Sequence, residues 1–346
     1  MIGLLTFEMS VAKLVIESHL NVPIMSQQDS KSIVTDELAE KVTGCLVGLA
    51  VGDALGAPLE FSSRNSVRKR FPMRLRDMIA SSLWAKGEYT DDTQMALLLA
   101  ESLLQDRGLM SSDLARRFRA WARTAKDVGT QTRAVVNMHG YEHNPESCAS
   151  RYFADHPDSS AGNGALMRCA PAALFCLNSA ERLIETTRAS ARVTHADPRA
   201  ESSCVLLNLW IRTAISRNVK DGRQDAIAFL GEGDRCVWQR LEHIEGCNED
   251  EILSSGYTVH TLEAAAWSFL TTESYEDAVV RAANLGDDAD TVAAVCGALA
   301  GAYYGYSAIP RRWLDVLKDE DRIRELALSL AARNYDATSN TIEKRK

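Results

Sequence analysis

Apolar residues recur at helical spacing along most of the chain, whereas the strict alternation of apolar and polar residues that marks a strand is hard to find. The clearest runs are Leu38, Val42, Leu46 and Leu49, and then Met95, Leu98, Leu99 and Leu103. Residues three or four positions apart share one face of a helix, so each run predicts an amphipathic helix. Prolines number only 8, and long stretches such as 91–105 contain neither proline nor glycine. The pattern therefore predicts an all-α fold.

One predicted helix carries glycine at every fourth position. These residues are Gly44, Gly48, Gly52 and Gly56. Each glycine inside a helix costs about 1 kcal/mol relative to alanine, so several on one face indicate that another backbone comes unusually close. Asp53 stands beside that face, and Glu60 follows Pro58. The segment between Lys41 and Arg64 is otherwise nearly free of charge, which favours a functional role for these two carboxylates over a surface position.

The overall charge and the cysteines narrow the class of protein. A net charge of -8 over 346 residues argues against sequence-independent binding of nucleic acid, which needs a basic face, and it is compatible with bound cations. The eight cysteines are scattered without a Cys-x-x-Cys pair, so we expect reduced, mostly buried thiols in a cytoplasmic protein. No segment reaches the roughly 18 consecutive apolar residues of a membrane helix, so no membrane partner is expected.

The first acidic run lies where a helix is predicted to begin. Thr90, Asp91 and Asp92 lead directly into the apolar residues that follow Met95. Threonine is a good N-cap, and aspartates in a first turn are stabilised by the helix dipole, typically by about 0.3–1 kcal/mol. Helix capping alone is therefore one sufficient explanation of this run, and ligation of a cation is the other.

Capping explains the second acidic run less well. Asp287, Asp288 and Asp290 fall within four residues, and no Lys or Arg occurs between Arg281 and Arg311. A divalent cation would offset their mutual repulsion, and carboxylates with threonine hydroxyls suit Mg²⁺ or Mn²⁺ better than Zn²⁺. The spacing does not match an EF-hand. If both acidic runs meet, they would hold two ions about 3.5–4 Å apart, an arrangement that activates water and binds substrate oxygens.

Other polar motifs are ambiguous from their residues alone. Gly162, Asn163 and Gly164 form a loop whose backbone amides would suit a phosphate, although it is neither a Walker loop nor a dinucleotide-binding fingerprint. His195 fits a hydrogen-bonded residue at a helix end as well as a site residue. Asp127 fits a turn residue as well as a site carboxylate. Tyr257 fits a turn as well as a platform on which a ligand stacks.

Taken in order, these motifs resemble the ADP-ribosylglycohydrolases, the family that includes the dinitrogenase reductase-activating glycohydrolases. The resemblance covers residues 41 to about 330. It rests on GLAVGDALGAPLE at 48–60, YTDDTQM at 89–95, GNGALMR at 162–168, THADP at 194–198 and LGDDADT at 285–291.

The resemblance implies a compact orthogonal helical bundle with a central metal cleft. It implies two Mg²⁺ ions, with Mn²⁺ as a substitute, held by Thr90, Asp91, Asp92, Asp288, Asp290 and Thr291. It further implies that Gly162, Asn163, Gly164, His195 and Tyr257 bind ADP-ribose, with Asp127 near the scissile bond. The expected enzyme is a hydrolase that removes ADP-ribose from protein, most readily from arginine side chains, with Asp91 and Asp92, then Glu60 and Asp127, as catalytic carboxylates.

Two positions depart from the pattern of the family. Asp287 stands where relatives often have glycine, and Ala289 where threonine is common. Neither change removes an expected ligand, but both change the charge or shape next to the metal site. The affinity for metal and the choice of substrate are the properties that these changes would alter.

The sequence divides into an N-terminal extension at 1–40, a catalytic domain at 41–335 and a tail at 336–346. A polar stretch at 26–35 separates the domain from an apolar segment whose residues follow helical spacing; they are Leu4, Leu5, Phe7, Val11, Leu14, Val15 and Ile16. One interpretation is a helix packed on the domain or a misassigned start. Another is an arm, residues 1–35, that binds an ADP-ribosyltransferase toxin, as in immunity proteins resembling this family.

Three hypotheses about function follow. The first is an active hydrolase whose partner is an ADP-ribosylated protein. The second is an immunity protein that blocks a toxin by binding, with hydrolysis secondary. The third is a helical scaffold in which the acidic runs only cap helices.

Overall fold

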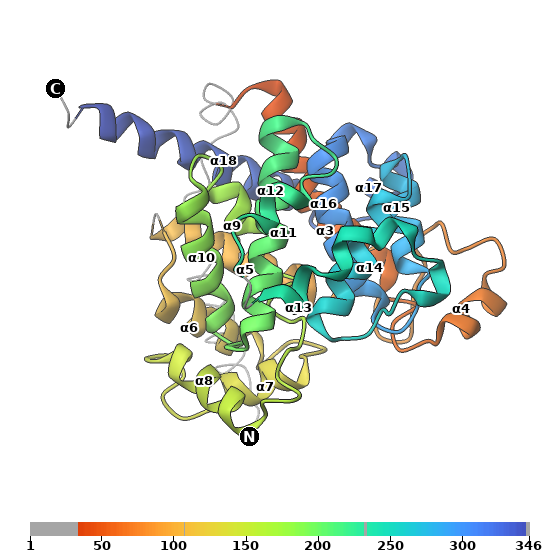
Figure 1. Ribbon diagram of the computed structural model, residues 1–346, viewed down its shortest axis with the longest axis horizontal. Coiled ribbons are helices and arrows are strands. Elements are labelled where there is room, and N and C mark those ends of the chain that lie inside the picture. Colours follow the sequence, from red (N-terminus) through yellow and green to blue (C-terminus); the bar gives the residue numbers. More distant parts are fainter. Residues whose placement is uncertain (1–33, 107, 232–233, 344–346) are drawn as a thin grey trace, which may run out of the picture.

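The computed structural model describes residues 34–106, 108–231 and 234–343, and within them the secondary structure is helical with no strand (Figure 1). The predicted all-α fold is confirmed. The α-helices are α3 (Asp36–Gly56), α4 (Arg64–Arg70), α5 (Asp91–Gln105), α6 (Ser111–Trp121), α7 (Thr130–Val136), α8 (Pro145–Asp155), α9 (Ala170–Phe175), α10 (Ala180–Arg192), α11 (Pro198–Arg217), α12 (Arg223–Ile227), α13 (Arg235–Trp238), α14 (Thr258–Leu270), α15 (Tyr275–Ala283), α16 (Ala289–Tyr304), α17 (Arg311–Leu314) and α18 (Glu320–Glu343). Short 3-10 helices are η2 (Arg240–Gly246), η3 (Glu249–Glu251) and η4 (Tyr306–Ala308).

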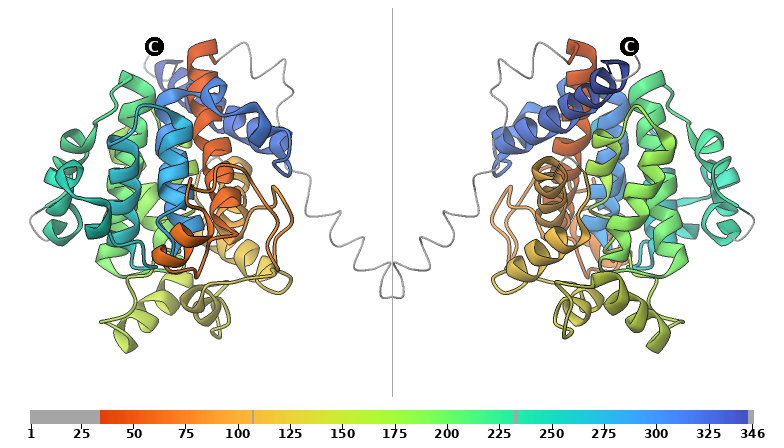
Figure 2. Two further views of the ribbon diagram at one scale, coloured as in Figure 1. Left: turned by 90° about the vertical axis from the view of Figure 1, so that its right-hand side faces the viewer. Right: turned by 90° about the vertical axis from the view of Figure 1, so that its left-hand side faces the viewer.

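Helices α3 and α16 form the centre of the molecule and pack side by side in antiparallel orientation (Figure 2). Gly48 of α3 faces Gly297 of α16, and a Cβ atom built on either glycine would overlap the carbonyl oxygen of the other. Gly52 faces the backbone of Ala293 in the same way. The close backbone approach expected from the glycine spacing is therefore confirmed. We call this contact the glycine seam; its facing pairs are Gly44 and Gly301, Gly48 and Gly297, Gly52 and Ala293, and Gly56 and Asp290.

The glycine seam fixes which ends of the two helices meet. Because the helices are antiparallel, the last turn of α3 lies against the first turn of α16, where a Cβ on Gly56 would come within 3.0 Å of Asp290 backbone atoms. Both helices are buried on all sides over most of their length, as expected for central helices that are apolar all round. The acidic start of α16 is thereby held beside Asp53, one turn before the end of α3.

The remaining helices cover this pair from two sides. Helices α11, α14 and α15 pack on α16, while α5 and α18 pack on α3. Helices α6, α7 and α8 lie farther out, at the lower edge of the molecule in Figure 1. The result is one hydrophobic core that includes side chains from α3 through α18.

The described chain begins two residues before α3 and ends with the last residue of α18. Thr35 is the N-cap of α3 and its hydroxyl accepts a hydrogen bond from the Leu38 amide, 3.3 Å away. The predicted boundary at residue 41 therefore falls within α3, and the boundary at 336 falls within α18. Most of the predicted partner-binding arm, residues 1–33, lies outside the described residues.

Two general expectations can be compared with the structure. All eight cysteines are free, and six of them are buried. Among the described helices, none combines the length and apolar character that crossing a membrane requires.

Candidate active site

The first acidic run is organised by Asp53, a fully buried carboxylate from another helix. Its Oδ1 accepts a hydrogen bond from the Thr90 amide at 2.9 Å, and its Oδ2 accepts one from the Thr93 amide at 3.0 Å. The Thr93 hydroxyl donates to the same Oδ2 at 2.5 Å. Asp53 therefore satisfies free amides at the start of α5 that a local cap would otherwise satisfy.

This arrangement changes the interpretation of Thr90. It occupies the N-cap position of α5 as the sequence predicts, but its side chain makes no capping hydrogen bond. The hydroxyl lies 3.3 Å from Asp92 Oδ2 and donates to it instead. Because Asp53 does the capping, capping alone does not account for the hydroxyl of Thr90 or for the buried carboxylate of Asp92.

A tight turn sets the start of the second acidic run. Gly286 and Asp287 have φ values of 76° and 56°, in the left-handed region that glycine adopts most readily. Aspartate tolerates this region better than most residues with a side chain, which fits Asp287 in this turn. Asp287 is exposed, and Ser254 donates to its Oδ2 at 3.3 Å, so its carboxylate points out of the cluster formed by the other acids.

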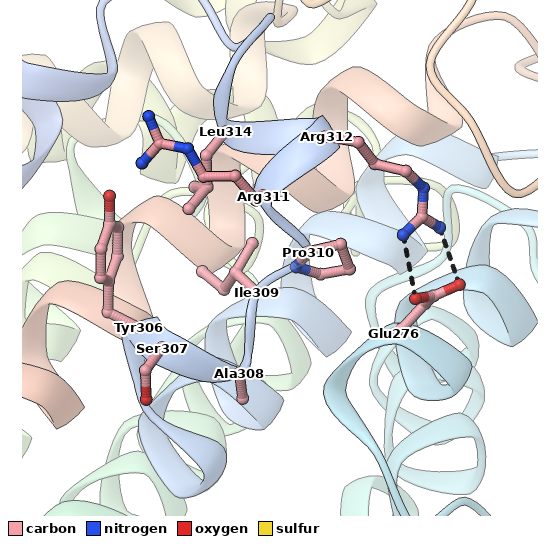
Figure 3. Close-up of a pocket in the computed structure, with 9 residues that line it drawn as sticks. All are labelled: Glu276, Tyr306, Ser307, Ala308, Ile309, Pro310, Arg311, Arg312 and Leu314. Carbon is pink, nitrogen blue, oxygen red and sulfur yellow. Dashed lines mark hydrogen bonds and ion pairs between the residues drawn. The ribbon is translucent and has the colours of Figure 1, made fainter.

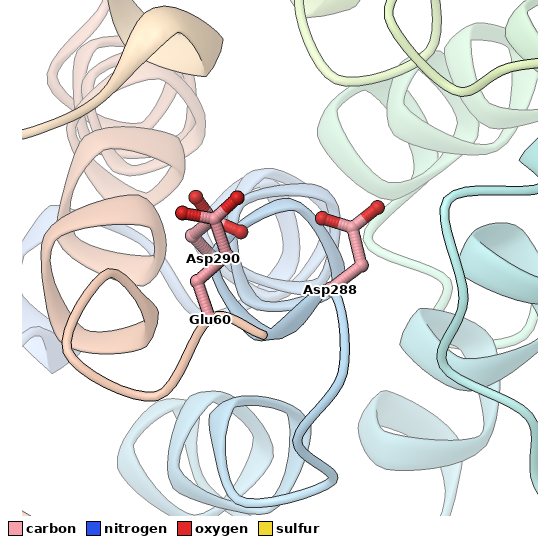
Figure 4. A group of neighbouring side chains, drawn as sticks. All are labelled: Glu60, Asp288 and Asp290. Carbon is pink, nitrogen blue, oxygen red and sulfur yellow. The ribbon is translucent and has the colours of Figure 1, made fainter. Parts of the chain in front are cut away.

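The same turn brings Glu60 to the second acidic run. The Phe61 amide donates to the Asp287 carbonyl at 2.7 Å, and the Asp287 amide donates to the Ser62 carbonyl at 2.8 Å. This pairing places the residue before Phe61 beside α16. One carboxylate oxygen from each of Glu60, Asp288 and Asp290 lies within 4.8 Å of the others (Figure 4).

The two acidic runs meet in the folded chain. The Thr291 hydroxyl lies 3.4 Å from Asp92 Oδ2, joining the first turn of α16 to that of α5. No ion pair to Lys, Arg or His involves Glu60, Asp91, Asp92, Asp288 or Asp290 among the described residues. We call these five carboxyl groups, together with Thr90 and Thr291, the acidic centre.

The electrostatics of the acidic centre reflect burial and crowding. Burial, then repulsion from Asp288, Asp127 and Asp91, raises the pKa of Glu60 to about 8. Burial and the charges of Asp127 and Asp53 raise the pKa of Asp91 to about 7. Burial also raises the pKa values of Asp92 and Asp290 well above their usual range, with neighbouring carboxylates as the further cause. The folded chain thus disfavours the charged form of each group when no cation is present.

The donors of the acidic centre fit a hard divalent cation. Asp92 Oδ1 is buried and has no hydrogen-bond partner, which is costly unless another ligand occupies that position. Carboxylate and hydroxyl oxygens are the ligands that Mg²⁺ and Mn²⁺ take in proteins, and no cysteine or histidine belongs to the centre. The chemistry of the residues present is therefore compatible with the expected metal.

The expected ADP-ribose residues lie next to the acidic centre and touch one another. The amide of Asn163 donates to the Gly256 carbonyl at 3.0 Å, and Gly162 and Tyr257 form an isolated antiparallel bridge. The Asn163 side-chain amide also donates to Asp288 Oδ2 at 2.6 Å. The structure thus joins two loops that are about 95 residues apart in sequence, and it connects them to the acidic centre through one side chain.

His195 lies directly beneath the glycine loop and is oriented by a buried network. A Cβ on Gly164 would lie 2.9 Å from His195 Cε1. Arg168 Nη2 donates to Thr194 Oγ1 at 2.8 Å, and this oxygen lies 2.8 Å from His195 Nδ1. Arg168 can only donate, and the Thr194 hydroxyl has no other acceptor among the described residues. Its proton is therefore directed at Nδ1, so Nε2 carries the ring proton. Burial and the charge of Arg168 lower the pKa of His195, which keeps the ring neutral.

The loop before α7 and the first turn of that helix contribute to the two parts of the site. Asp127 is half-buried, and its charge is a leading cause of the raised Asp91 pKa. Gln131, four residues on, has a buried Oε1 without a partner, 3.5 Å from the position of a Cβ on Gly162. This acceptor was not among the expected site residues.

Every expected site residue except Asp127 therefore lies in one of two neighbouring groups, the acidic centre or the loops over His195, and Asp127 lies in the loop before α7. The sequence reasoning assigned Glu60 to proton transfer only, whereas the structure also places it among the possible metal ligands. It did not assign roles to Asp53, Arg168, Thr194 or Gln131. Asp53, Arg168 and Thr194 lie inside the motifs that carry the resemblance, and Asp53 was also isolated in an apolar segment, but no role followed from this. Gln131 carried no signal.

A surface hollow of about 690 Å³ lies elsewhere, around η4 and α17 (Figure 3). It is bordered by Tyr306, Ile309 and Pro310, and by Glu276, which forms an ion pair with Arg312 at 2.8 Å. No expected site residue borders it, so its size does not make it the active site.

Comparisons with known proteins agree with this geometry. The model of the ADP-ribosylglycohydrolase family matches residues 34–340. ADP-ribosylarginine hydrolase Tri1 from Serratia proteamaculans is 35% identical over 323 residues, which are 90% of this chain and 82% of that protein. ADP-ribosyl-(dinitrogen reductase) glycohydrolase from Rhodospirillum rubrum is 33% identical, over 85% of this chain and 96% of that protein. A solved structure described as an ADP-ribosylglycohydrolase-related protein complex aligns with a TM-score of 0.70 and 34% identity, over 87% of this chain and all of that one.

Proposed function

The chain belongs to the ADP-ribosylglycohydrolase family, and from that premise we propose that it hydrolyses the N-glycosidic bond between ADP-ribose and an arginine side chain of a modified protein. Hydrolases of this family typically depend on a metal. The proposal includes two Mg²⁺ ions at the acidic centre. The arginine linkage is favoured by two relatives whose names specify ADP-ribosylarginine, at 35% and 32% identity.

The observation that carries the proposal is the meeting of Asp92 with Thr291 in a buried site whose carboxylates form no ion pair with a described Lys, Arg or His. The proposed ligands are Thr90, Asp91, Asp92, Asp288, Asp290 and Thr291, with Glu60 at the edge of the set. When bound, Mg²⁺ supplies Lewis-acid polarisation of a substrate oxygen and of a water molecule. A scaffold in which the carboxylates only cap helices would not leave Asp92 Oδ1 buried without a partner.

The side chains have distinct proposed roles. The loop of Gly162, Asn163 and Gly164 binds ADP-ribose, His195 offers an Nε2–H donor beneath it, and Tyr257 stacks on the nucleotide. Asp127 lies outside the ligand set and close to Asp91, so it is placed to accept a proton from the attacking water.

Glu60 is proposed to protonate the departing guanidine. Its carboxyl group lies beside those of Asp288 and Asp290, at the edge of the proposed ligand set. Asp91 and Asp92 share the task of orienting water, with Asp91 the nearer of the two to Asp127.

The test is release of label from a protein ADP-ribosylated on arginine, with and without Mg²⁺, beside the same assay on a serine-linked substrate. We expect release from arginine that requires Mg²⁺ or Mn²⁺ and is lost in Asp91→Ala combined with Asp288→Ala. The matched control is Asp321→Ala, whose carboxylate is 83% exposed and should leave the rate unchanged. Full activity of the double variant contradicts the proposal, and release from serine alone contradicts its choice of linkage.

A second function, toxin binding through residues 1–35, remains a separate proposal. Its support is that the family match begins at residue 34, while the preceding segment carries apolar residues at helical spacing. Removing residues 1–33, which spares the N-cap Thr35, should abolish capture of an ADP-ribosyltransferase toxin and leave hydrolysis intact. Capture that persists after removal contradicts this function.

A further inference from the structure

A smaller hollow of about 290 Å³ lies between the end of α14, helix α15 and the loop that follows α4. Three arginines line it, together with two carboxylates and three uncharged residues; they are Arg74, Arg76, Arg281, Glu273, Asp277, Thr271, Thr272 and Val280. None of these residues belongs to the acidic centre or to the loops over His195. We call this hollow the arginine pocket.

Arg281 is the group whose charge is least compensated. Its Nη1 donates to the carbonyl and hydroxyl oxygens of Thr271, at 2.9 and 2.5 Å, and its Nε is buried without a partner. No carboxylate forms an ion pair with it in the described part of the chain. Its Nη2 carries no hydrogen bond and is not among the buried atoms that lack a partner, so this nitrogen remains accessible. Burial and the positive charge of Arg74 both lower the pKa of Arg281.

Arg74 and Arg76 are held in place by a clamp on the residue between them. The Leu75 amide donates to Asn284 Oδ1 at 2.8 Å, and Asn284 Nδ2 donates back to the Leu75 carbonyl at 2.9 Å. Arg74 has a φ of 62°, a left-handed conformation that costs about 1–2 kcal/mol for a residue with a side chain. The buried clamp maintains this conformation, and with it the position of both guanidinium groups.

Both arginines keep a nitrogen for a further ligand. Arg74 uses Nη2 for Glu249 at 2.7 Å, while Arg76 uses Nε and Nη2 for Glu276 and Nη2 for Asp277. Nη1 of each forms no hydrogen bond within the described chain. The ion pairs are partly exposed, and exposed pairs contribute only about 0–1 kcal/mol, so they leave attraction for another anion.

The end of α14 does not repel an anion here. Its terminal carbonyls would normally present negative potential to the pocket. The Thr271 carbonyl, however, accepts from Arg281, and the Thr272 carbonyl accepts from Lys220. Glu273, which also borders the pocket, has a side chain that is 94% exposed and extends into solvent.

We propose that the arginine pocket binds a phosphate group, either free inorganic phosphate or the phosphate of a phosphomonoester. Arginine nitrogens in a fixed fork match phosphate oxygens better than any other side chain. Sites for whole small molecules usually occupy roughly 300–1,000 Å³. The volume of about 290 Å³ therefore suits a single phosphate rather than a nucleotide.

The test is titration of the full-length protein with inorganic phosphate in EDTA, which prevents binding through a cation at the acidic centre. Isothermal calorimetry should show saturable binding at fixed ionic strength. Binding should weaken at least about 10-fold in Arg281→Gln and in Arg74→Gln, because each removes charge-assisted hydrogen bonds. The matched control is Arg311→Gln, which removes an arginine that is 80% exposed outside the pocket and should bind phosphate as the parent does.

Arg281 also caps α14, so its replacement reduces stability. Arg76→Gln therefore provides a second test, because Arg76 makes only exposed ion pairs. Titration with O-phosphoserine identifies the source of the phosphate: equal or tighter binding indicates a phosphomonoester, and weaker binding indicates free phosphate. No saturable binding to the parent protein, or unchanged affinity in Arg281→Gln, Arg74→Gln and Arg76→Gln, overturns the proposal.

Discussion

The glycine seam and the acidic centre meet at the start of α16, yet they are built on opposite principles. Along the seam, Gly48 and Gly297 have no side chain, no charge and no free space. At its end, Asp92 and Asp290 crowd like charges together and leave a buried oxygen without a partner. The seam contributes stability through contact alone, while the centre costs stability until a cation offsets it. Substitutions in the two regions should therefore differ in their effects on stability and on hydrolysis.

The largest effect on stability is expected from adding one methyl group to the seam. Gly52→Ala should lower the free energy of unfolding by about 3 kcal/mol, because its Cβ would overlap the Ala293 carbonyl. In an ordinary helix interior the same change stabilises by about 1 kcal/mol, so the sign is the informative result. Urea denaturation measures it. Gly246→Ala, where a Cβ meets nothing within 4 Å, is the control and should stay within about 0.5 kcal/mol. A stabilised Gly52→Ala would contradict the contact.

A substitution in the acidic centre should lower activity while raising the stability of the metal-free protein. Asp92→Asn keeps the shape but removes the charge, so hydrolysis should fall at least about 100-fold. The metal-free protein should become more stable at pH 9, by about 1 kcal/mol, because a disfavoured buried charge is gone. Label release and urea denaturation in EDTA measure the two effects. Loss of stability comparable to that of Gly52→Ala would show that the two regions do not differ as described.

The pH dependence of stability should expose the cost of the acidic centre. The folded-state pKa values of Glu60 and Asp91, about 8 and about 7, lie above their ordinary values of 4.5 and 3.8. Their favourable contribution is complete below about pH 4 and is lost as pH rises to about 8, because the unfolded chain releases these protons more readily. In EDTA the melting temperature should therefore fall across this window. Asp321→Ala, which removes an exposed carboxylate outside the acidic centre, is the control and should show the same fall. Saturating Mg²⁺ should remove most of this fall. A melting temperature in EDTA that does not change with pH would contradict the crowding of carboxylates in the acidic centre.

The smallest effect is expected from the network that orients His195. Thr194→Val removes the hydroxyl between Arg168 and the ring, leaving a buried donor unsatisfied at a cost of about 1–3 kcal/mol. The Nε2–H tautomer should lose its preference, and hydrolysis should fall about 10-fold. Nitrogen chemical shifts of the His195 ring report the tautomer, which a purely structural defect would not change. Thr194→Ser keeps the hydroxyl and should restore both properties.

The parts of this molecule that the sequence predicted are the local ones. Helical spacing at Leu46 and Met95 identified α3 and α5, and glycine spacing identified the seam, because both patterns repeat within one helix. The two acidic runs were recognised as helix starts for the same reason. Their meeting, through Asp92 and Thr291, depends on the antiparallel packing of α3 and α16, which the resemblance to a family supplied and local spacing did not.

The parts that the sequence did not predict depend on contacts between distant residues. Asp53 caps a helix that begins 38 positions later in the chain, so no local capping rule identifies it. Glu60 reaches the acidic centre through the paired left-handed residues Phe61 and Asp287. Arg168 acts on His195 only through Thr194. Each assignment required the positions of two elements relative to each other.

The glycine seam also limits how the length of the chain can change. An α-helix turns by about 100° per residue, so a single insertion between Gly44 and Asp53 would rotate this carboxylate away from α5 while pushing side chains into α16. A deletion within 293–301 would do the same to the opposing helix. Insertions and deletions among homologues should therefore be absent from these two segments and collect in loops far from them.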